Sequence, residues 1–330
     1  MAITIKDIAN KAGISAASVS RILTNRGRFS EETAQRVREL ANEMGYFKNQ
    51  SAADLSQKTS RVIGILVPTN RTNFADEIIK GMQKKAYELG YELLIAFVET
   101  DSQQQIKTVR SLLSRQLLAV VMLAIDIEDA VLDVLNSADV KLLSVSNQLN
   151  NDIPSISSDN YAMMHTIVDH LYAHGHRQMA LIGASDPDPI VAILRRQGYI
   201  DALASHGITY NPDFIWGVEM AFQTGIDAIK KFGLPLPFTA VIGSADIISI
   251  GLLNGALDAG ISVPNDLSIV TVDGTELTQL TRPILTATQQ NFAQMGELAI
   301  TNLANHSLSP HSVIFTDITL IPGGTVATIG

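Results

Sequence analysis

The sequence contains no cysteine among its 330 residues. This excludes a disulfide framework and thiolate metal sites, and it fits a reducing compartment. The sequence also lacks any uncharged apolar run of 18 or more residues, so we expect no segment to span a membrane. The N-terminal residues lack the apolar core of a secretory signal peptide. These absences together predict a soluble, cytoplasmic protein with no membrane partner.

The common catalytic signatures are absent too. The sequence has no G-x-S-x-G, no phosphate-binding P-loop and no G-x-G-x-x-G. Three histidines, His170, His174 and His176, lie close together near one predicted helix end. A metal site would need further ligands, and helix-end histidines more often bond to backbone carbonyls. We therefore predict neither an enzyme nor a metal or cofactor site.

Charge is distributed unevenly along a chain whose net charge is -9. Residues 1–61 hold ten lysines and arginines against six acidic residues, whereas the remainder holds 14 against 27. A basic N-terminal part on an acidic body suggests that only the N-terminal part meets a polyanion such as DNA. The alternative, that small domains simply vary in charge, stays open at this point.

The first 45 residues predict three short helices and no strand. Thr4 and Asp7 have the spacing of a capping box, and Gly13 ends the first helix. Ser15 and Ser30 are the expected N-caps of the other two helices. The helices are expected at 5–12, 16–23 and 31–45. Residues 46–61 are polar and read as a linker.

From Val62 onward, apolar segments alternate with helical segments, and the length suits two or three domains. Several predicted helices end in a glycine that supplies a left-handed C-cap, namely Gly90, Gly175, Gly207 and Gly260. Continuous apolar strands between helices indicate parallel sheets covered on both faces. The strands are expected at 62–68, 91–98, 118–125, 141–145, 179–183, 238–244 and 267–272. So many units predict two α/β lobes, with a ligand cleft near the carboxyl ends of the strands.

The predicted helix 16–23 has two different faces. Val19, Ile22 and Leu23 fall on one side, whereas Ala17, Arg21 and Thr24 fall on the other. The second face is small, hydroxylated and cationic. Small residues allow close approach to the major groove, and an arginine can bond guanine in bidentate fashion. The alternative is a solvated helix face that carries one arginine.

These motifs resemble the lactose-repressor/galactose-repressor (LacI/GalR) family of bacterial transcription regulators. The resemblance is carried by "TIKDIANKAGISAASVSRILTN", "SEETAQRVRELANEMGY", "NQSAADL", "HGHRQMALIG" and "LTATQQ" and covers nearly the whole chain. It implies an N-terminal all-α helix-turn-helix head plus an α/β core of two doubly wound parallel-sheet lobes, similar to periplasmic sugar-binding proteins. The implied parts are a DNA-binding domain at 1–46, a hinge helix at 47–61 and an effector-binding and dimerisation domain at 62–330. Lobe 1 would hold about 62–159 plus 291–318, and lobe 2 about 160–290 plus 319–330.

The resemblance also implies roles in DNA binding. Ala16 and Ala17 occupy the two variable base-reading positions, and Arg21 would reach a base edge. Phosphates would be held by Thr4, Ser15, Ser18, Ser20, Ser30 and Thr33. The segment from Asn49 would become a hinge helix on DNA, with Ala52 and the wedge Leu55 in the minor groove. Family members often carry proline where this chain has Lys48.

Six positions match the family's effector site: Phe74, Ser146, Arg195, Asp246, Asp273 and Phe292. A planar guanidinium opposite a carboxylate suits the vicinal hydroxyls of a sugar. The chain departs from the family pattern where Ser146 and Asn147 replace Asp-Arg, and at Ala245, Gly274 and Gln289. These departures remove hydrogen-bonding groups, so the identity of the sugar is open.

The predicted function is a ligand-responsive repressor of a carbohydrate-utilisation operon. It would bind a palindromic double-stranded operator as a homodimer and be released by a small sugar or sugar derivative. No heptad tail follows the last predicted strand, which favours a dimer over a tetramer. The alternative is a sugar-binding or sugar-modifying α/β protein that has no operator switch.

Overall fold

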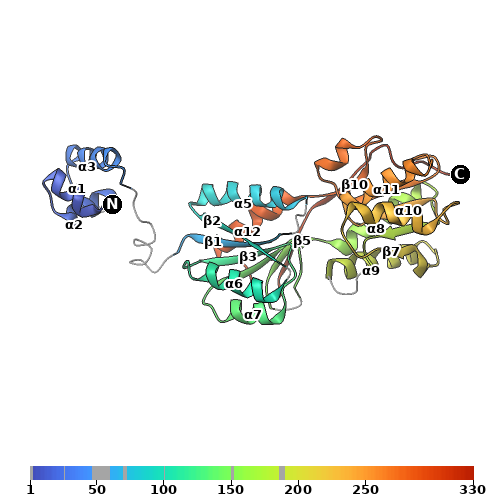
Figure 1. Cartoon of the computed structure of the whole chain (residues 1–330), viewed down its shortest axis with the longest axis horizontal. Helices are drawn as coiled ribbons and strands as arrows, with labels where there is room; N and C mark the ends of the chain where they lie inside the picture. Colours follow the sequence, from blue (N-terminus) through green and yellow to red (C-terminus); the bar gives the residue numbers. More distant parts are fainter. Residues whose placement is uncertain are drawn as a thin grey trace. The chain divides into compact units, whose positions relative to one another are not determined.

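A computed structural model of the chain describes residues 3–25, 27–46, 60–69, 73–99, 101–149, 152–185 and 190–330. The chain divides into two compact units, a head (Met1–Ser60) and a body (Arg61–Gly330). Figure 1 shows helices alone in the described part of the head and two sheets flanked by helices in the body. Within these described ranges, no helix is both long and apolar enough to cross a bilayer.

The described part of the head consists of helices α1 (Ile5–Ala12), α2 (Ala16–Leu23) and α3 (Glu31–Glu43). The predicted N-caps are confirmed, since Thr4, Ser15 and Ser30 each accept a backbone N–H bond from the first turn of their helix. The third helix ends two residues earlier than predicted, because Met44 is its C-cap and Gly45 adopts a left-handed φ of 67°. The three helices share one small apolar core, made of Ile8, Ala9, Ala12, Val19, Ile22, Ala34, Val37 and Ala41.

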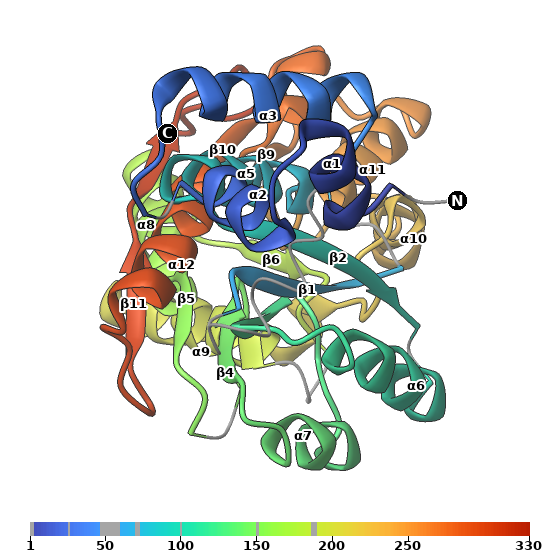
Figure 2. The ribbon, with the colours of Figure 1, turned by 90° about the vertical axis from the view of Figure 1, so that its left-hand side faces the viewer.

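The first sheet of the body has six parallel strands in the order β11-β5-β4-β3-β1-β2. The strands are β1 (Val62–Pro68), β2 (Glu92–Val98), β3 (Ala119–Leu123), β4 (Lys141–Val145), β5 (Ser155–Ser158) and β11 (Val313–Thr316). Helices α5 (Ala75–Leu89) and α12 (Phe292–Asn305) cover one face, and α6 (Ser102–Leu113) and α7 (Asp129–Asn136) cover the other. Figure 2 shows α6 and α7 lying side by side.

The second sheet also has six strands, in the order β12-β10-β9-β8-β6-β7. They are β6 (Met179–Ile182), β7 (Ile215–Trp216), β8 (Ala240–Gly243), β9 (Ser268–Asp273), β10 (Thr286–Gln290) and β12 (Ile318–Ile321). Only the edge strand β12 runs antiparallel to its neighbour; the other pairs are parallel. The predicted fold class, a helical head followed by two doubly wound parallel-sheet lobes, is confirmed, with β12 as an antiparallel addition.

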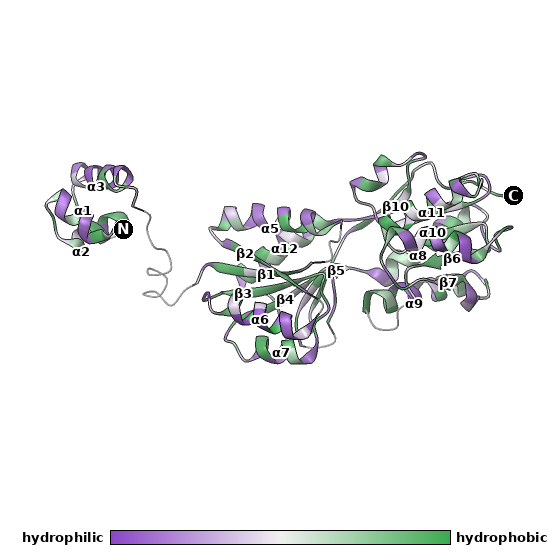
Figure 3. Cartoon of the chain, viewed as in Figure 1, coloured by the Kyte–Doolittle hydropathy of each residue, from purple (hydrophilic) through white to green (hydrophobic). Residues whose placement is uncertain are grey.

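Helices also cover both faces of the second sheet. α8 (Asn160–Ala173) and α9 (Ile190–Ser205) pack on one face, and α10 (Phe222–Phe232) and α11 (Asp246–Asp258) pack on the other. Two short 3-10 helices, η1 (Pro212–Phe214) and η2 (Glu276–Leu280), complete this lobe. In Figure 3 the strands at the centre of each lobe are largely hydrophobic, as expected of sheets buried on both faces.

Each of the seven predicted strand segments contains a strand, and the four predicted C-cap glycines all have left-handed φ angles between 70° and 92°. Within the described residues the chain passes between the two sheets at three crossovers: β5 to α8, β10 to α12 and β11 to β12. Each crossover leaves from the carboxyl end of its strand. In parallel α/β sheets, that end is where ligands bind.

Candidate DNA-binding and effector-binding sites

Helix α2 presents the predicted outward face. Val19 and Ile22 are buried in the core of the head, whereas Ala17 and Arg21 are exposed. The Arg21 Nε donates to the Ala17 carbonyl at 3.3 Å, so the base of the side chain lies along the helix. The predicted small, cationic face is therefore available to a partner. Its role in reading bases stays a prediction.

The predicted phosphate-binding hydroxyls gather at the amino ends of the three helices. Ser15 Oγ accepts from the Ser18 N–H at 3.1 Å, and Ser30 Oγ accepts from the Thr33 N–H at 3.3 Å. Thr4 Oγ1 accepts from the Asp7 N–H at 3.4 Å. Backbone N–H groups and the positive end of the helix dipole both favour an anion at such a position. The other predicted phosphate residue, Ser20, lies on α2 and is partly exposed.

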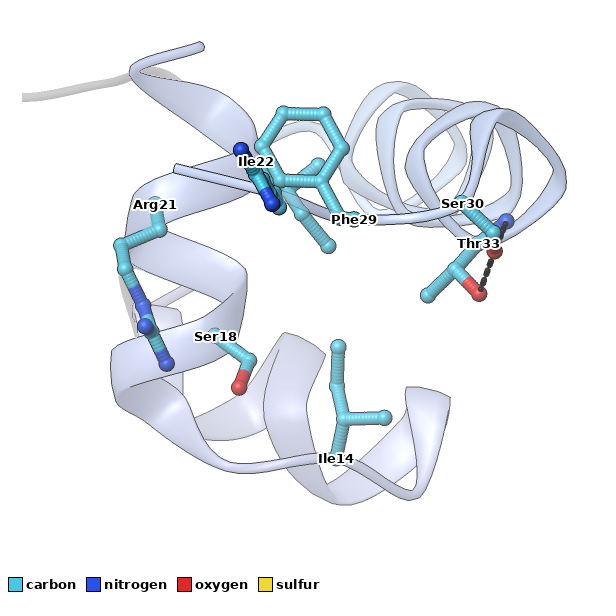
Figure 4. A pocket seen from close by; sticks show the side chains of 8 residues that line it. Ile14, Ser18, Arg21, Ile22, Phe29, Ser30 and Thr33 are labelled. Carbon is cyan, nitrogen blue, oxygen red and sulfur yellow. Dashed lines mark hydrogen bonds between the residues drawn. The ribbon is translucent and has the colours of Figure 1, made fainter. Parts of the chain in front are cut away.

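A hollow of about 210 Å³ lies between α2 and α3, and three of the predicted phosphate-binding residues line it (Figure 4). Ser18 and Arg21 reach it from α2, and Ser30 and Thr33 reach it from the start of α3. The remaining lining residues are Ile14, Ile22, Arg28 and Phe29. Two arginines with three hydroxyls and no acid form a lining that suits a phosphate.

The sequence prediction missed Arg28, an exposed residue that lines this hollow. The available signal was its position in the short basic run "RGRFS" directly before an N-cap serine. Three other predicted DNA contacts, Asn49, Ala52 and Leu55, lie outside the described residues.

In the second lobe, the structure brings Arg195 and Asp273 together. Their side chains approach to 3.6 Å between Nη2 and Oδ1, and both residues are more than nine-tenths buried. The Arg195 Nε donates to Asn160 Oδ1 at 2.8 Å, and Nη1 donates to the Ser244 carbonyl. The ion pair is therefore held in place by an amide and a backbone carbonyl and is not a loose surface pair.

Burial dominates the electrostatics of this pair. It raises the pKa of Asp273, and the nearby Arg195 guanidinium opposes that rise. Burial likewise lowers the pKa of Arg195. Asp273 also has a positive φ of 92°, a conformation that costs energy for a residue other than glycine. Such strain at a buried charge is typical of a ligand-binding position.

Asp246, at the start of α11, is held differently. Its carboxylate accepts hydrogen bonds from the Thr271 hydroxyl at 3.0 Å, the Gly274 N–H at 3.2 Å, and both the N–H and the hydroxyl of Thr275 at 2.7 Å. Burial, together with the charge of Asp273, raises the pKa of Asp246 to about 7. The observed bonds fasten the turn that follows β9, so Asp246 fixes the backbone beside Asp273. Direct contact with an effector stays a prediction.

The predicted residues of the first lobe form a separate group. Phe74 and Phe292 stack at the starts of α5 and α12, with ring centroids 4.7 Å apart. Ser146 directly follows β4 and has a positive φ of 63°. The neighbouring Asn147 donates to Asp126 Oδ1 at 2.7 Å. Five of the six predicted effector residues end a strand or lie in the segment that follows one, whereas Arg195 lies on helix α9. Phe74 and Phe292 lie in one lobe, and Arg195, Asp246 and Asp273 lie in the other.

Sequence reasoning missed two amides that bond to the ion pair, Asn160 and Gln290. Gln290 Nε2 donates to Asp273 Oδ1 at 2.7 Å. The "TATQQ" motif contains Gln290, but nothing in the sequence distinguishes it from Gln289, which is exposed.

Two of the three clustered histidines form ring hydrogen bonds within the fold, and the His170 ring lies against that of His174, with centroids 4.3 Å apart. His176 Nε2 donates to the Ala327 carbonyl at 3.1 Å, which leaves Nδ1 to accept from the Thr239 hydroxyl at 2.8 Å. His174 Nδ1 donates to the His170 carbonyl at 2.8 Å. Burial lowers the pKa of both His170 and His176, which favours neutral rings. These contacts agree with the interpretation that histidines near a helix end bond to backbone carbonyls.

The fold and the two sites define a class of protein. A small helical head with a helix-turn-helix motif precedes an α/β body whose charged groups gather at the carboxyl ends of parallel strands. This combination is that of a DNA-binding regulator with a ligand-binding body.

Comparison with known proteins agrees with this class. Residues 4–49 match "Bacterial regulatory proteins, lacI family", and residues 168–326 match "Periplasmic binding protein-like domain". The chain is 30% identical to the HTH-type transcriptional repressor CytR of Escherichia coli strain K12, over 94% of this chain and 91% of CytR. The chain therefore belongs to the LacI family of bacterial regulatory proteins. Its relatives are transcriptional regulators, and it is a regulator and not an enzyme.

Solved structures show the same relationship. The LacI family regulator CCPA from Weissella paramesenteroides, with bound glucose, is 36% identical, with a TM-score of 0.77 over 81% of this chain and 99% of that chain. The lac repressor dimer bound to operator and the anti-inducer ONPF is 23% identical, with a TM-score of 0.89 over 99% of this chain and 100% of that chain. The similarity to the lac repressor supports the fold only.

Proposed function

We propose that this regulator represses a carbohydrate-utilisation operon and that a small sugar or sugar derivative releases it from DNA. The observation that carries the proposal is the buried Arg195–Asp273 pair at the carboxyl ends of the second sheet. A fixed donor and a fixed acceptor side by side can bind two neighbouring hydroxyl groups. Support also comes from relatives: CytR is a transcriptional repressor, and the Weissella regulator was solved with glucose and with sucrose.

The head would dock α2 in the major groove of a palindromic operator. Arg21 would bond a guanine edge, and Ala16 and Ala17 would contact thymine methyl groups. The phosphates would be held by Thr4, Ser15, Ser18, Ser20, Ser30, Thr33 and the newly recognised Arg28. The hinge residues Asn49, Ala52 and Leu55 remain part of the proposal as the minor-groove contact.

A palindromic operator requires two heads, so the working form would be a homodimer. The body exposes several large apolar side chains, among them Tyr87, Phe97 and Leu280. Single exposed apolar side chains are common on monomers, so the proposed dimer rests on the two-fold operator. A DNA-binding regulator of this kind would act in the cytoplasm.

The experiment is a titration of the full chain onto DNA from its own upstream region and from the promoters of the adjacent genes. Fluorescence anisotropy would follow binding, and glucose, sucrose and other sugars would then be added at a fixed protein concentration. We expect one promoter fragment to bind far more tightly than scrambled DNA, and one sugar to weaken that binding. If a sugar binds by calorimetry but leaves operator affinity unchanged, the body is a binding module without a switch.

A further inference from the structure

A hollow of about 590 Å³ lies at the carboxyl ends of β1, β2 and β3 in the first lobe. Thr69 directly follows β1, and Glu99 directly follows β2. Asp126 and Glu128 lie between β3 and α7, and Gln105 reaches the hollow from α6. None of the six predicted effector residues lines it, and α6 lies on the opposite face of the sheet from the helices α5 and α12. The hollow is therefore built from residues with no role in the sites described above.

The lining of this hollow is acidic. Its three acidic residues are Glu99, Asp126 and Glu128, and no lysine, arginine or histidine is among its described lining residues. None of the three carboxylates forms an ion pair with a described residue. Glu99 accepts from the Thr69 hydroxyl at 3.0 Å and Asp126 from the Asn147 amide at 2.7 Å, so their observed partners are neutral. Acidic side chains by themselves are commonly solvated, and a site needs a further feature.

That feature is a buried amide oxygen in the wall of the hollow. Gln105 is 5% exposed, and its Nε2 donates to the Glu99 carbonyl at 2.9 Å. A carbonyl can only accept, so this bond fixes the orientation of the amide. The Oε1 of Gln105 is then a buried acceptor that has no hydrogen-bond partner among the described residues. Since few buried polar atoms in native structures stay unpaired, we infer that a donor entering the hollow completes it.

These features together describe a ligand that donates hydrogen bonds and carries positive charge. A protonated amine meets both requirements, because an ammonium group has three donors and no acceptor. A metal ion fits less well, since within the described ranges no three histidine or acidic side chains are grouped to hold one. Val98, Ile125 and Ile127 add apolar surface to the lining, which suits a carbon chain attached to the amine.

The acidic residues belong to two different ends of the hollow. β1 lies between β2 and β3 in the sheet. The backbone at Glu99, after β2, is therefore about two strand spacings, roughly 10 Å, from the backbone that follows β3 and carries Asp126 and Glu128. An ammonium group beside Glu99 and Gln105 leaves the other two carboxylates without a cation. A short chain with an ammonium group at each end can serve both.

We propose that this hollow binds a small aliphatic diamine. One ammonium group lies between the Glu99 carboxylate and the Gln105 Oε1, and the other lies against Asp126 and Glu128. The site goes beyond the proposed function, because it is formed within one lobe and requires neither operator DNA nor a sugar.

Calorimetry on the full chain tests the proposal with three probes of equal length. 1,4-Diaminobutane has two ammonium groups, n-butylamine has one, and 1,4-butanediol has none. We expect the diamine to bind at least about tenfold more tightly than the monoamine, because each ammonium group forms charge-assisted hydrogen bonds. The diol should give no binding heat, and added salt should weaken the binding of the diamine.

Two substitutions remove one partner each and keep the side-chain length. Glu99→Gln removes a carboxylate at an exposed position, and Gln105→Met removes the buried acceptor. Each should weaken diamine binding about tenfold. The control Glu92→Gln makes the same charge change at the exposed first residue of β2, at the other end of the strand, and should bind as the parent does. Urea unfolding checks that each variant is folded, and Glu99→Gln carries the test by itself if Gln105→Met is unstable.

Three outcomes would overturn the proposal. Equal diamine affinity in Glu99→Gln and in the control would place the binding elsewhere on the chain. A diol that binds as tightly as the diamine would remove the role of charge. Binding of magnesium chloride that depends on Glu99, without binding of the diamine, would make the hollow a metal site. A failure of the proposed function leaves all these measurements unaffected, because none of them involves operator DNA.

Discussion

The rings of Phe74 and Phe292 stack with their centroids 4.7 Å apart and their planes inclined by only 8°. Phe74 is the N-cap residue of α5, and Phe292 is the first residue of α12. The stack therefore joins the starts of the two helices that cover one face of the first sheet. Phe292 is 1% exposed, whereas Phe74 is half-buried, so Phe292 supports one face of Phe74 from the core.

Because Phe292 and Phe74 differ in burial, their replacement by alanine should lower the free energy of unfolding by different amounts. Phe292→Ala should lower the free energy of unfolding by about 3–5 kcal/mol, because it empties a fully buried site. Phe74→Ala should cost clearly less in stability and should weaken sugar binding more. Urea unfolding and calorimetry on both variants check this. Equal losses of stability would make Phe74 an ordinary core residue instead of a wall of the effector site.

The two arginines of the head should differ in what they recognise. Arg21→Ala should weaken operator binding by about 1–3 kcal/mol and scrambled-DNA binding far less, because it removes a bidentate base contact. Arg28→Ala should weaken both kinds of DNA alike and reduce the salt dependence of binding by about one phosphate contact. Anisotropy titrations at several salt concentrations separate these patterns. If Arg21→Ala weakened both DNAs by the same factor, Arg21 would be a phosphate contact.

Much of the fold could be predicted because short stretches of the sequence determine where helices begin and end. The N-cap serines at 15 and 30 and the glycines at 13, 90 and 260 fix helix ends by their own backbone chemistry. The apolar segments of the central strands are long enough to recognise. Five strands were missed. Two of them, β5 ("SISS") and β10 ("TATQQ"), are polar but mostly buried, so no rule based on apolar runs can find them. The other three, β7, β11 and β12, are only two to four residues long.

The site was predictable only in part, for a related reason. Arg195 and Asp273 lie 78 positions apart in the sequence, and the family resemblance, not their spacing, paired them. Asn160 and Gln290 are ordinary amides until the fold places them on the pair. The polar strands β5 and β10 are buried because each lies between two other strands of its sheet. The chain therefore departs from simple hydrophobic patterning close to the proposed effector site.

Close helix packing in the second lobe gives a prediction with an internal control. A Cβ added at Gly251 on α11 would lie 2.1 Å from the Phe222 carbonyl oxygen of α10, which no side-chain movement can relieve. At Gly255, one turn further along, the nearest atoms would lie at 3.2 Å. Gly251→Ala should therefore cost about 1–3 kcal/mol through overpacking, and Gly255→Ala clearly less. Urea unfolding of the two variants measures this. A larger cost at Gly255 would contradict the observed helix approach.

The buried carboxyl of Asp246 should make stability depend on pH. Its pKa is raised from the ordinary 3.8 to about 7, by burial first and then by the charge of Asp273. Between these two values the folded chain binds a proton at Asp246 that the unfolded chain does not. The resulting stabilisation is fully present below the unfolded pKa and is lost as the pH rises through about 7.

Asp246→Asn removes this titration, although its amide cannot accept all four of the bonds that hold the turn after β9. The loss of these hydrogen bonds lowers the unfolding free energy of the variant by the same amount at every pH. The test therefore compares how the unfolding free energy of each chain changes with pH, and not its absolute value. Between pH 5.5 and 8 the parent chain should lose about 2 kcal/mol more unfolding free energy than the variant. Urea unfolding of both chains at pH 5.5 and pH 8 measures the difference. Parallel pH profiles would mean that Asp246 is ionised throughout this range, with the four donors outweighing its burial.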